Sequence, residues 1–535
     1  MQSYDVVVVG GGHNGLVAAA YLARAGLRVR LLERLEHIGG AAVSVQAFDG
    51  VEVRVSRYSY LVSLLPSRII SDLGISVPLS RRKFASYTPD PATAGSSGLL
   101  LGPYGGRVHD QLAAVGAASD AHGFANFYRH CRLVTERVWP TLLEPLRTRE
   151  QARRDVVEGN APEAAAAWQA MVDEPIGRAI AAAVANDLVR GVIATDALIG
   201  TFARMDDQSL LQNICFLYHV LGGGTGDWNV PVGGMGSVTS SLGAAAARHG
   251  AEITTGADVF AIEPSGEVSY RNRAAEHRIR GRFVLSAVAP AVLGELLGDA
   301  GASPVCDKVP PTAPGAQVKV NMVLRRLPRL RDSTVTPEQA FTGTFHANQT
   351  WTQLDSAYTQ AVGGELPAPL PCEAYCHSLT DPTILSADLH DMGAQTLTVF
   401  GLHTPHSVFG SAKFEADPNV LRDRQTESVL SSLNSVLAEP IQDLLMTDAH
   451  GQPCIETTTT SDLQRALKMP EGNIFHGALS WPFADDDDPL DTPARRWGVA
   501  TNLDQIMLCG SGARRGGAVS GIGGHNAAMA VLSSL

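Results

Sequence analysis

Glycines with the spacing G-x-G-x-x-G form the clearest chemical pattern of the chain, at Gly10, Gly12 and Gly15. The first glycine of this pattern allows a tight turn, the second lets a pyrophosphate approach the backbone, and the third lets a helix lie close on a strand. Glu33 follows 18 residues after Gly15, close to the spacing of about 20 residues at which a carboxylate binds a ribose. Together these residues predict a dinucleotide site.

The segments around the glycines have the pattern of a strand–turn–helix–strand unit. Residues 4–9 are rich in valine and residues 28–32 form a second apolar run, as in buried parallel strands. Between them, residues 16–25 are rich in alanine and leucine and stop at Gly26, a residue type that commonly ends helices. The N-terminus of this helix would direct free N–H groups and a positive dipole end at phosphates. The unit predicts a Rossmann-like α/β domain.

A pair of adjacent glycines, Gly39 and Gly40, helps to distinguish an FAD site from an NAD site. It follows Glu33 and Arg34 closely and is continued by Ala41. This stretch resembles the second fingerprint of FAD oxidoreductases of the glutathione-reductase-like and amine-oxidase-like folds. In those folds the paired glycines let another stretch of backbone meet the dinucleotide, so the pattern favours FAD over NAD.

The C-terminus repeats the glycine theme. Residues 505–509 have the pattern of a buried strand, residues 510–524 are rich in glycine, and an alanine-rich helix ends the chain. Residues 222–236 are also rich in glycine, but no apolar strand runs into them, so they indicate no second dinucleotide site. Short strands around Gly266 predict a small antiparallel insert.

The region between these parts is largely helical in pattern, from residue 120 to residue 203. Within it an apolar side chain recurs at every fourth position, at Ile176, Ile180, Val184 and Leu188. This spacing predicts a helix with one buried stripe.

Composition excludes several classes of protein. A net charge of -12 and a pI near 5.7 argue against a nucleic-acid surface. Seven cysteines in 535 residues, none in a C-x-x-C pair, give neither a disulfide framework nor a zinc site. The most apolar long stretch, residues 179–203, contains four charged or amide side chains and predicts no membrane span. We expect a cytoplasmic protein, with peripheral membrane contact and oligomeric state left open.

Taken together, the motifs resemble one family. The chain is similar to the phytoene-desaturase-like FAD oxidoreductases, and within them to the branch typified by pyridine nucleotide-disulfide oxidoreductase domain-containing protein 2. The stretches that carry the resemblance span nearly the whole chain: residues 10–16, 39–42, 228–238, 473–477 and 510–528. It implies a Rossmann-like FAD-binding domain with an inserted mixed α+β substrate domain. The expected division is 1–75, 226–300 and 471–535 for the FAD-binding domain, 76–225 for a mostly helical cap, and 301–470 for the substrate sheet.

The resemblance also implies roles for individual residues. Glu33 would bind the adenosine ribose, Val259 would meet the adenine, and the C-terminal glycine-rich turn would lie along the ribityl chain and the flavin. The whole expected cofactor-binding set is Gly10, Gly12, His13, Asn14, Gly15, Glu33, Arg34, Gly39, Gly40, Ala41, Val259, Gly510, Gly512, Gly521 and Ile522. No cysteine stands in the Cys-Tyr context of covalent flavin attachment, so we expect non-covalent FAD. Relatives often have His-Pro-Gly-Gly-Gly where this chain has Arg514-Arg515-Gly516-Gly517-Ala518, which predicts a different local charge near the cofactor.

The expected reaction is removal of a hydride from a substrate carbon by the flavin N5 atom. The favoured substrate is fairly apolar and, by the resemblance, isoprenoid-like, with oxygen or a quinone as electron acceptor. An amine or amino-acid oxidase and a non-catalytic flavin-binding or assembly protein remain as alternatives.

The catalytic base stays open in the sequence. The candidates are His346, His377, His403 and His476, and His476 has an advantage because it lies in a stretch that carries the resemblance. Trp228, Tyr375 and Trp481 could line a substrate pocket or pack in a core. The run from Asp485 to Asp488 predicts an exposed acidic loop, and no metal site is expected.

Overall fold

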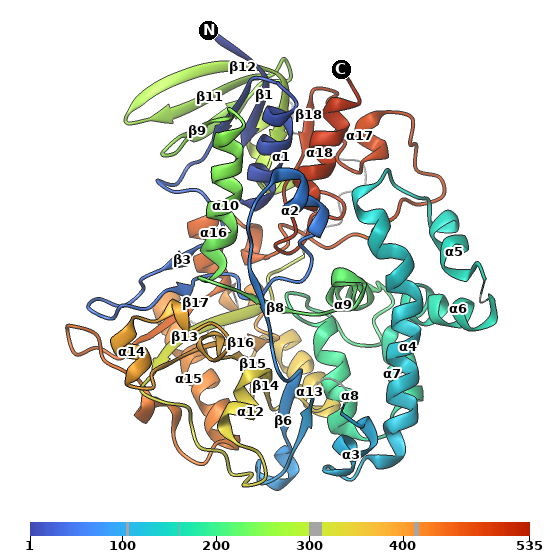
Figure 1. Cartoon of the computed structure of the whole chain (residues 1–535), viewed down its shortest axis with the longest axis vertical. Helices are drawn as coiled ribbons and strands as arrows, with labels where there is room; N and C mark the ends of the chain where they lie inside the picture. Colours follow the sequence, from blue (N-terminus) through green and yellow to red (C-terminus); the bar gives the residue numbers. More distant parts are fainter. Residues whose placement is uncertain (103–105, 160, 299–312, 411–416) are drawn as a thin grey trace.

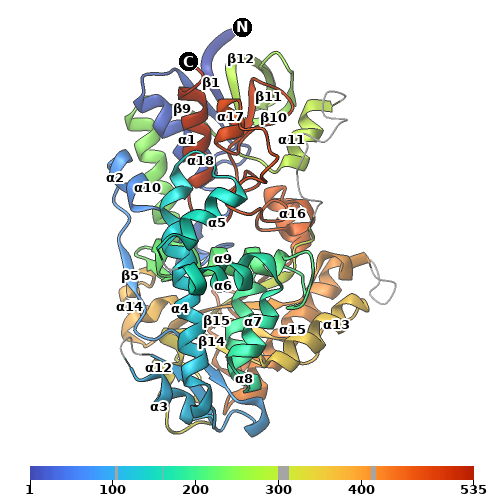
Figure 2. The same cartoon turned by 90° about the vertical axis from the view of Figure 1, so that its right-hand side faces the viewer.

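The protein contains two seven-stranded sheets, two small two-stranded sheets and a helical region (Figure 1). The computed structural model describes residues 1–102, 106–159, 161–298, 313–410 and 417–535. The first sheet lies near both termini, the second lies at the opposite end of the long axis, and the helical region runs along one side of both (Figures 1 and 2).

The first sheet has a parallel core with an antiparallel extension. Its strand order is β10-β11-β12-β1-β2-β9, with β18 also paired to β12. Its strands are β1 (Gln2–Val9), β2 (Val29–Leu32), β9 (Glu252–Thr254), β10 (Asp258–Ile262), β11 (Glu267–Asn272), β12 (Ala275–Ser286) and β18 (Ile506–Leu508). The first half of β12 pairs antiparallel with β11, and its second half pairs parallel with β1 and β18. The antiparallel insert around Gly266 and the Rossmann-like α/β fold are both confirmed.

Three helices cover one face of this sheet: α1 (His13–Arg24), α10 (Met235–Arg248) and α18 (Ile522–Leu532). Helix α1 is buried along nearly its whole length, which its alanines permit, and Gly26 follows it with φ of +88°. Glycine is required where α18 crosses α1, since a Cβ atom on Gly524 would lie 2.0 Å from the carbonyl oxygen of Asn14. The first and last helices of the chain therefore pack backbone to backbone.

The second sheet is mixed, with the order β17-β13-β16-β15-β14-β6-β7. Its strands are β6 (Ser86–Pro89), β7 (Gly98–Leu101), β13 (Gln317–Leu324), β14 (Thr344–Ala347), β15 (Cys372–Tyr375), β16 (Gln395–Leu402) and β17 (Ile455–Thr458). Helices α12 (Pro337–Thr342) and α15 (Pro418–Val436) contact one face. The strands β6 and β7 come from the part of the chain that the sequence assigns to the helical cap.

Alternation along β13 shows how this sheet divides its two faces. Val318, Val320 and Met322 pack in the apolar core of the sheet. Lys319 points the other way and donates hydrogen bonds to the carbonyl oxygens of Ser56 and Ser59, at 2.6 and 2.8 Å. A period of two places alternate side chains on opposite faces, so the polar positions of β13 face residues 56–59.

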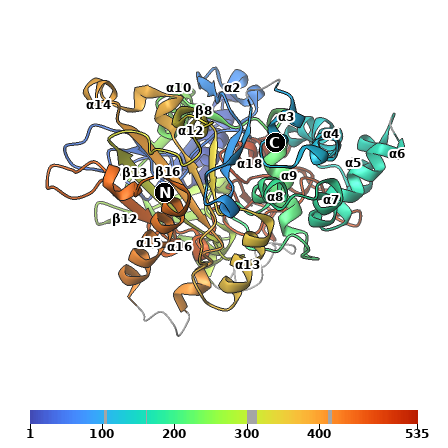
Figure 3. The ribbon, with the colours of Figure 1, turned by 90° about the horizontal axis from the view of Figure 1, so that it is seen from below.

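The helical region flanks the second sheet (Figure 3). It includes α4 (Ala121–Val138), α5 (Arg149–Val157), α6 (Ala161–Trp168), α7 (Ile176–Ala183), α8 (Asp187–Ala194) and α9 (Leu211–Leu221). The prediction of one helix through the stripe at residues 176–188 is wrong, because Val184 is extended and Asn186 caps the new helix α8. All four stripe residues are nevertheless buried. The expected domain boundary between residues 300 and 301 lies outside the described residues.

Candidate functional site: a cavity between the two sheets

A cavity of about 410 Å³ extends from the glycine-rich turn that follows β1 to the second sheet. At one end it is lined by the turn after β1, the end of β2 and residues 257–259, and at the other by residues 58–61 and side chains from α9 and the second sheet. The expected cofactor-binding residues on its wall are Gly10, Gly12, His13, Asn14, Gly15, Glu33, Arg34, Gly40, Ala41, Val259 and Gly510. One cavity thus gathers residues from both ends of the chain.

The glycines of the turn are required for different physical reasons. A Cβ atom on Gly15 would lie 2.1 Å from the carbonyl oxygen of Gly10, so Gly15 is required by the fold itself. Gly12 has an ordinary φ of -69°, and the nearest atom to an added Cβ is the Cα of Gly40, at 4.0 Å. Because Gly12 lines the cavity, its missing side chain leaves room for a ligand beside the backbone.

Glu33 is fixed at the end of β2. Its carboxylate accepts hydrogen bonds from the backbone N–H groups of Gly11, at 2.7 Å, and of Leu35, at 2.8 Å. The side chain is buried yet borders the cavity. A carboxylate held by two backbone donors keeps acceptor capacity for a further donor such as a ribose hydroxyl.

Five buried polar atoms of cavity-lining residues have no hydrogen-bond partner in the described structure. Three belong to His13 (Nε2), Asn14 (Oδ1) and His476 (Nδ1), and the other two are Ser59 Oγ and Gln317 Oε1. Burial lowers the pKa of His13 and of His476 to about 4 in each case. Both imidazoles are therefore neutral near pH 7 and can donate or accept one hydrogen bond at the free nitrogen. Orphaned buried polar atoms are rare in proteins, and the position of the first three beside the turn fits a bound polar cofactor.

Four of the expected cofactor-binding residues do not line the cavity: Gly39, Gly512, Gly521 and Ile522. Gly39 donates its N–H to the carbonyl oxygen of Gly11, at 2.9 Å, and so holds the two fingerprints together. Gly512 packs on Pro290, Gly521 caps α18 with φ of +73°, and Ile522 is fully buried at the start of that helix.

Of the four candidate histidines, His476 alone lines the cavity. His346, His377 and His403 are buried elsewhere, and burial lowers the pKa of each to about 3. His346 Nδ1 lies 2.8 Å from Thr88 Oγ1 in the second sheet.

The far end of the cavity is rich in aromatic side chains that the sequence motifs do not reveal. Tyr60, His219 and Phe400 join Trp228, which the sequence singles out. Tyr375 packs on Tyr60 behind this wall, with ring centroids 4.9 Å apart. His219 and Trp228 lie close in the chain, but Tyr60 and Phe400 come from distant segments, so spacing in the sequence carries no signal for the group as a whole.

The Arg514-Arg515 pair does not place charge on the cavity wall, contrary to expectation. Arg515 is buried and donates hydrogen bonds to the carbonyl oxygens of Thr141, Glu144 and Trp497. Arg514 contacts Asp488 at 3.4 Å. The pair ties the C-terminal loop to its neighbours, away from the cavity.

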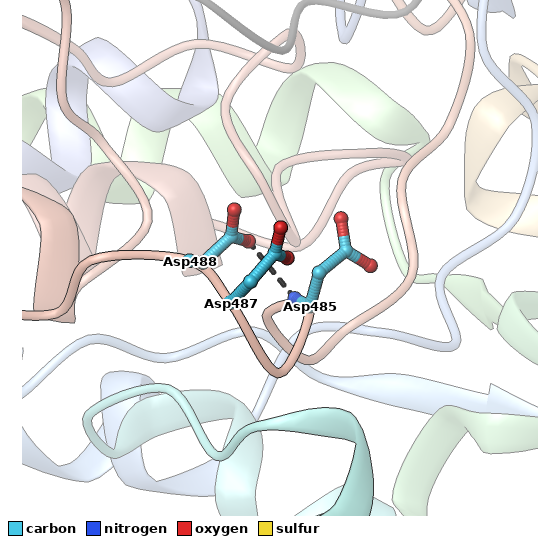
Figure 4. A group of neighbouring side chains, drawn as sticks. All are labelled: Asp485, Asp487 and Asp488. Atoms are coloured by element: carbon cyan, nitrogen blue, oxygen red, sulfur yellow. Dashed lines mark hydrogen bonds between the residues drawn. The ribbon is translucent and has the colours of Figure 1, made fainter.

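The acidic run forms a turn on the surface (Figure 4). The carboxylates of Asp485, Asp487 and Asp488 approach within 4.8 Å of one another, and the N–H of Asp485 donates to Asp488 Oδ2 at 2.9 Å. Asp488 also contacts Arg514, which joins the turn to the C-terminal loop.

No helix in the described part of the chain has the length and apolar character needed to cross a bilayer.

Comparison with known proteins agrees with this arrangement. A model of NAD(P)-binding Rossmann-like domains matches residues 8–66. The protein named uncharacterized protein Rv0897c, of Mycobacterium tuberculosis, is 74% identical over 100% of this chain and 98% of its own length. Pyridine nucleotide-disulfide oxidoreductase domain-containing protein 2 of Mus musculus is 28% identical over 99% of this chain and 94% of its own length.

Two further similarities concern parts or the fold. Carotenoid 3,4-desaturase of Haloarcula japonica is 43% identical over 74 residues, which are 14% of this chain and 15% of the relative. A solved structure of a putrescine oxidase variant covers 100% of both chains with a TM-score of 0.59 and 14% identity, which shows a shared fold. The chain therefore belongs to one family with Rv0897c, homologous to pyridine nucleotide-disulfide oxidoreductase domain-containing protein 2 among the oxidoreductases with a Rossmann-like dinucleotide-binding domain.

Proposed function

We propose that the protein binds FAD non-covalently and uses it to dehydrogenate or desaturate a fairly apolar small molecule. The observation that carries the proposal is the single cavity that begins at the glycine-rich turn and ends among aromatic side chains of the second sheet. A dinucleotide and a substrate need such a continuous space, because the reacting carbon must lie against the flavin.

In this proposal each end of the cavity has its own ligand. Glu33 would accept a hydroxyl of the adenosine ribose, and the N-terminus of α1 with Gly12 would hold the pyrophosphate. Val259 would meet the adenine, and the turn at Gly510 would approach the flavin. Gly39, Gly512, Gly521 and Ile522 would support the site from behind, since none of them lines the cavity.

When bound, FAD supplies the two-electron acceptor for a hydride from the substrate. The residues of the chain bind and orient the substrate and exclude water, for which the apolar and aromatic wall is suited. The second hydrogen of the dehydrogenation leaves as a proton from the neighbouring carbon or from an attached heteroatom. Oxygen or a quinone would then remove the electrons from the reduced cofactor. The described cysteines are all free thiols.

Anaerobic mixing of the FAD-loaded protein with candidate substrates tests this proposal. We expect a fairly apolar substrate to bleach the oxidised flavin absorbance, and air or a quinone to restore it. An isoprenoid series and an amine series of matched length separate the two enzyme hypotheses. A flavin that dithionite reduces, but that no member of either series bleaches, would instead support the non-catalytic hypothesis.

A further inference from the structure

The end of the cavity opposite the glycine-rich turn is walled by aromatic rings. Tyr60 stacks nearly parallel to Trp228, with centroids 5.8 Å apart, and meets Phe400 edge-on at 4.9 Å. His219 packs on Trp228 at 4.7 Å. All four side chains line the cavity. Faces of electron-rich rings attract cations as well as apolar groups, so this wall suits either kind of ligand.

Two carboxyl groups lie directly behind these rings. Asp196 Oδ1 is 4.0 Å from His219 Nε2, and the partly buried Asp196 side chain does not itself line the cavity. Glu373 on β15 is almost fully buried and accepts hydrogen bonds from Thr195 Oγ1, at 2.6 Å, and from the Tyr375 hydroxyl. Burial of a carboxylate is costly without a cation nearby. The positive groups around Asp196 and Glu373 therefore determine whether the site favours a cationic ligand.

The charged groups that act on Asp196 do not balance. Glu373 adds a second acid and Arg82 supplies one cation. Burial raises the pKa of both carboxyls, so one excess negative charge arises only when both have lost their protons. The guanidinium of Arg82 is engaged with Thr344 Oγ1, at 2.8 Å, and with the carbonyl oxygen of Trp228. Lys319 is held by the carbonyl oxygens of Ser56 and Ser59, behind Phe400, and burial lowers its pKa to about 7.

The remaining titratable neighbours of Asp196 are neutral near pH 7. Burial lowers the pKa of His219 to about 3 and raises the pKa values of the others: Cys215, Cys131, Tyr60 and Tyr128. Once both carboxyls are ionised, none of these groups can balance the second negative charge. A ligand with one positive charge would balance it.

We propose that this aromatic end of the cavity, with Asp196 and Glu373 behind it, binds a positively charged nitrogen, so that the substrate is a fairly apolar amine. The inference rests on the proposed function and narrows its substrate class. The nitrogen would lie against the faces of Tyr60 and Trp228, where ring and carboxylate attraction add. The apolar part of the substrate would extend toward the flavin along the rest of the wall.

This recognition depends on pH with a defined sign. Burial, and secondarily the charge of Glu373, raises the pKa of Asp196 to about 8. Below that pH the binding of a cation must displace a proton from Asp196, and above it the carboxylate is already ionised. The affinity for a permanently charged ligand therefore rises as the pH passes upward through about 8 and then levels off.

The test compares two probes of nearly the same shape that differ in charge. Benzyltrimethylammonium carries a permanent cation, and neopentylbenzene has a carbon atom in place of its nitrogen. Calorimetric titration of the full-length protein with each probe gives affinities independent of the flavin absorbance. At about pH 9 we expect the cation to bind at least about tenfold more tightly, and we expect that preference to shrink by about pH 7. Equal affinities, or tighter binding of neopentylbenzene, would overturn the inference.

Variants assign the effect to one carboxyl. Asp196→Asn keeps the shape of the side chain and should lower the affinity for the cation at least about tenfold at high pH. It should also remove the rise in affinity near pH 8 and leave neopentylbenzene binding unchanged. Asp206→Asn is the matched control, because Asp206 is 71% exposed. An Asp196→Asn protein that binds the cation as the parent does would contradict the inference. FAD content, measured separately, shows whether the proposed function itself holds, since the calorimetric comparison needs no flavin signal.

Discussion

At the scale of single residues, the glycine-rich turn contains one glycine that the fold requires and another that leaves space for a ligand. Gly15 has no room for a side chain in the protein alone, because a Cβ atom there would lie 2.1 Å from the carbonyl oxygen of Gly10. Gly12 has that room, and the space belongs to the cavity. A motif that looks uniform in the sequence thus contains two glycines with different functions.

Replacing each of these glycines by alanine should give opposite results. Gly12→Ala should keep the unfolding free energy of the cofactor-free protein within about 0.5 kcal/mol, because its φ suits alanine, yet lower FAD affinity at least about tenfold. Gly15→Ala should destabilise the cofactor-free protein by several kcal/mol, since its methyl group overlaps the backbone. Chemical denaturation and FAD titration measure the two quantities. Equal destabilisation by both variants would contradict this assignment.

At the scale of elements, Arg515 joins the C-terminal glycine-rich loop to the helical region. Its guanidinium donates to carbonyl oxygens at Thr141, Glu144 and Trp497. The residue has φ of +68° and is buried, and burial lowers its pKa to about 10. The loop is therefore held by a charged side chain that lies off the cavity wall.

Removal of this guanidinium should cost stability and spare the cofactor site. We expect Arg515→Met to lower the free energy of unfolding by roughly 2–4 kcal/mol, because buried carbonyl oxygens lose charged donors. Arg154→Met removes an arginine that is 66% exposed and should change stability by less than about 0.5 kcal/mol. Denaturant unfolding of both variants, with FAD content as the second readout, tests this role. A loss of FAD from Arg515→Met without destabilisation would contradict it.

Elements built from local signals could be predicted from the sequence, and elements built from long-range pairing could not. The unit from β1 to β2 is recognisable by valine runs, glycines and an alanine-rich helix within about thirty residues. The pairing of β6 with β14, by contrast, joins Ser86 and Tyr87 to a strand more than two hundred residues later. The break at Val184 escapes prediction for a related reason, since four-residue spacing continues across a turn that only the cap at Asn186 reveals.

The candidate site divides in the same way. Most of its nucleotide end follows from motifs with fixed spacing. The substrate end does not, because Tyr60, His219 and Phe400 meet only after the two sheets and α9 are assembled.

At the scale of the whole molecule, buried histidines link stability to pH. Burial lowers the pKa to about 4 for His13, His476 and His525, and to about 3 for His219, His346, His377 and His403. In the unfolded chain these imidazoles take up a proton near pH 6.5, whereas in the folded chain they do so only below about pH 4. The stability from neutral burial is therefore present above pH 6.5 and is lost as the pH falls toward 4.

The free energy of unfolding should fall steeply between about pH 6.5 and pH 4, by about 1.4 kcal/mol per pH unit for each histidine fully protonated in the unfolded chain. His403→Asn should reduce this slope by about one proton, and asparagine tolerates the left-handed backbone at that position. Urea unfolding across this range measures the slope, and a flat profile would contradict the neutral burial of these imidazoles.

The central claim is that one FAD molecule lies in the cavity that starts at Gly12. The direct measurement is release of cofactor from the purified protein by denaturation, followed by chromatographic identification and quantification against protein. We predict about one FAD per chain, all of it released without cleavage of the protein, and a strongly reduced yield from Gly12→Ala. Release of NAD(P) in place of FAD, flavin that stays attached to the denatured chain, or an unchanged yield from Gly12→Ala would contradict the account.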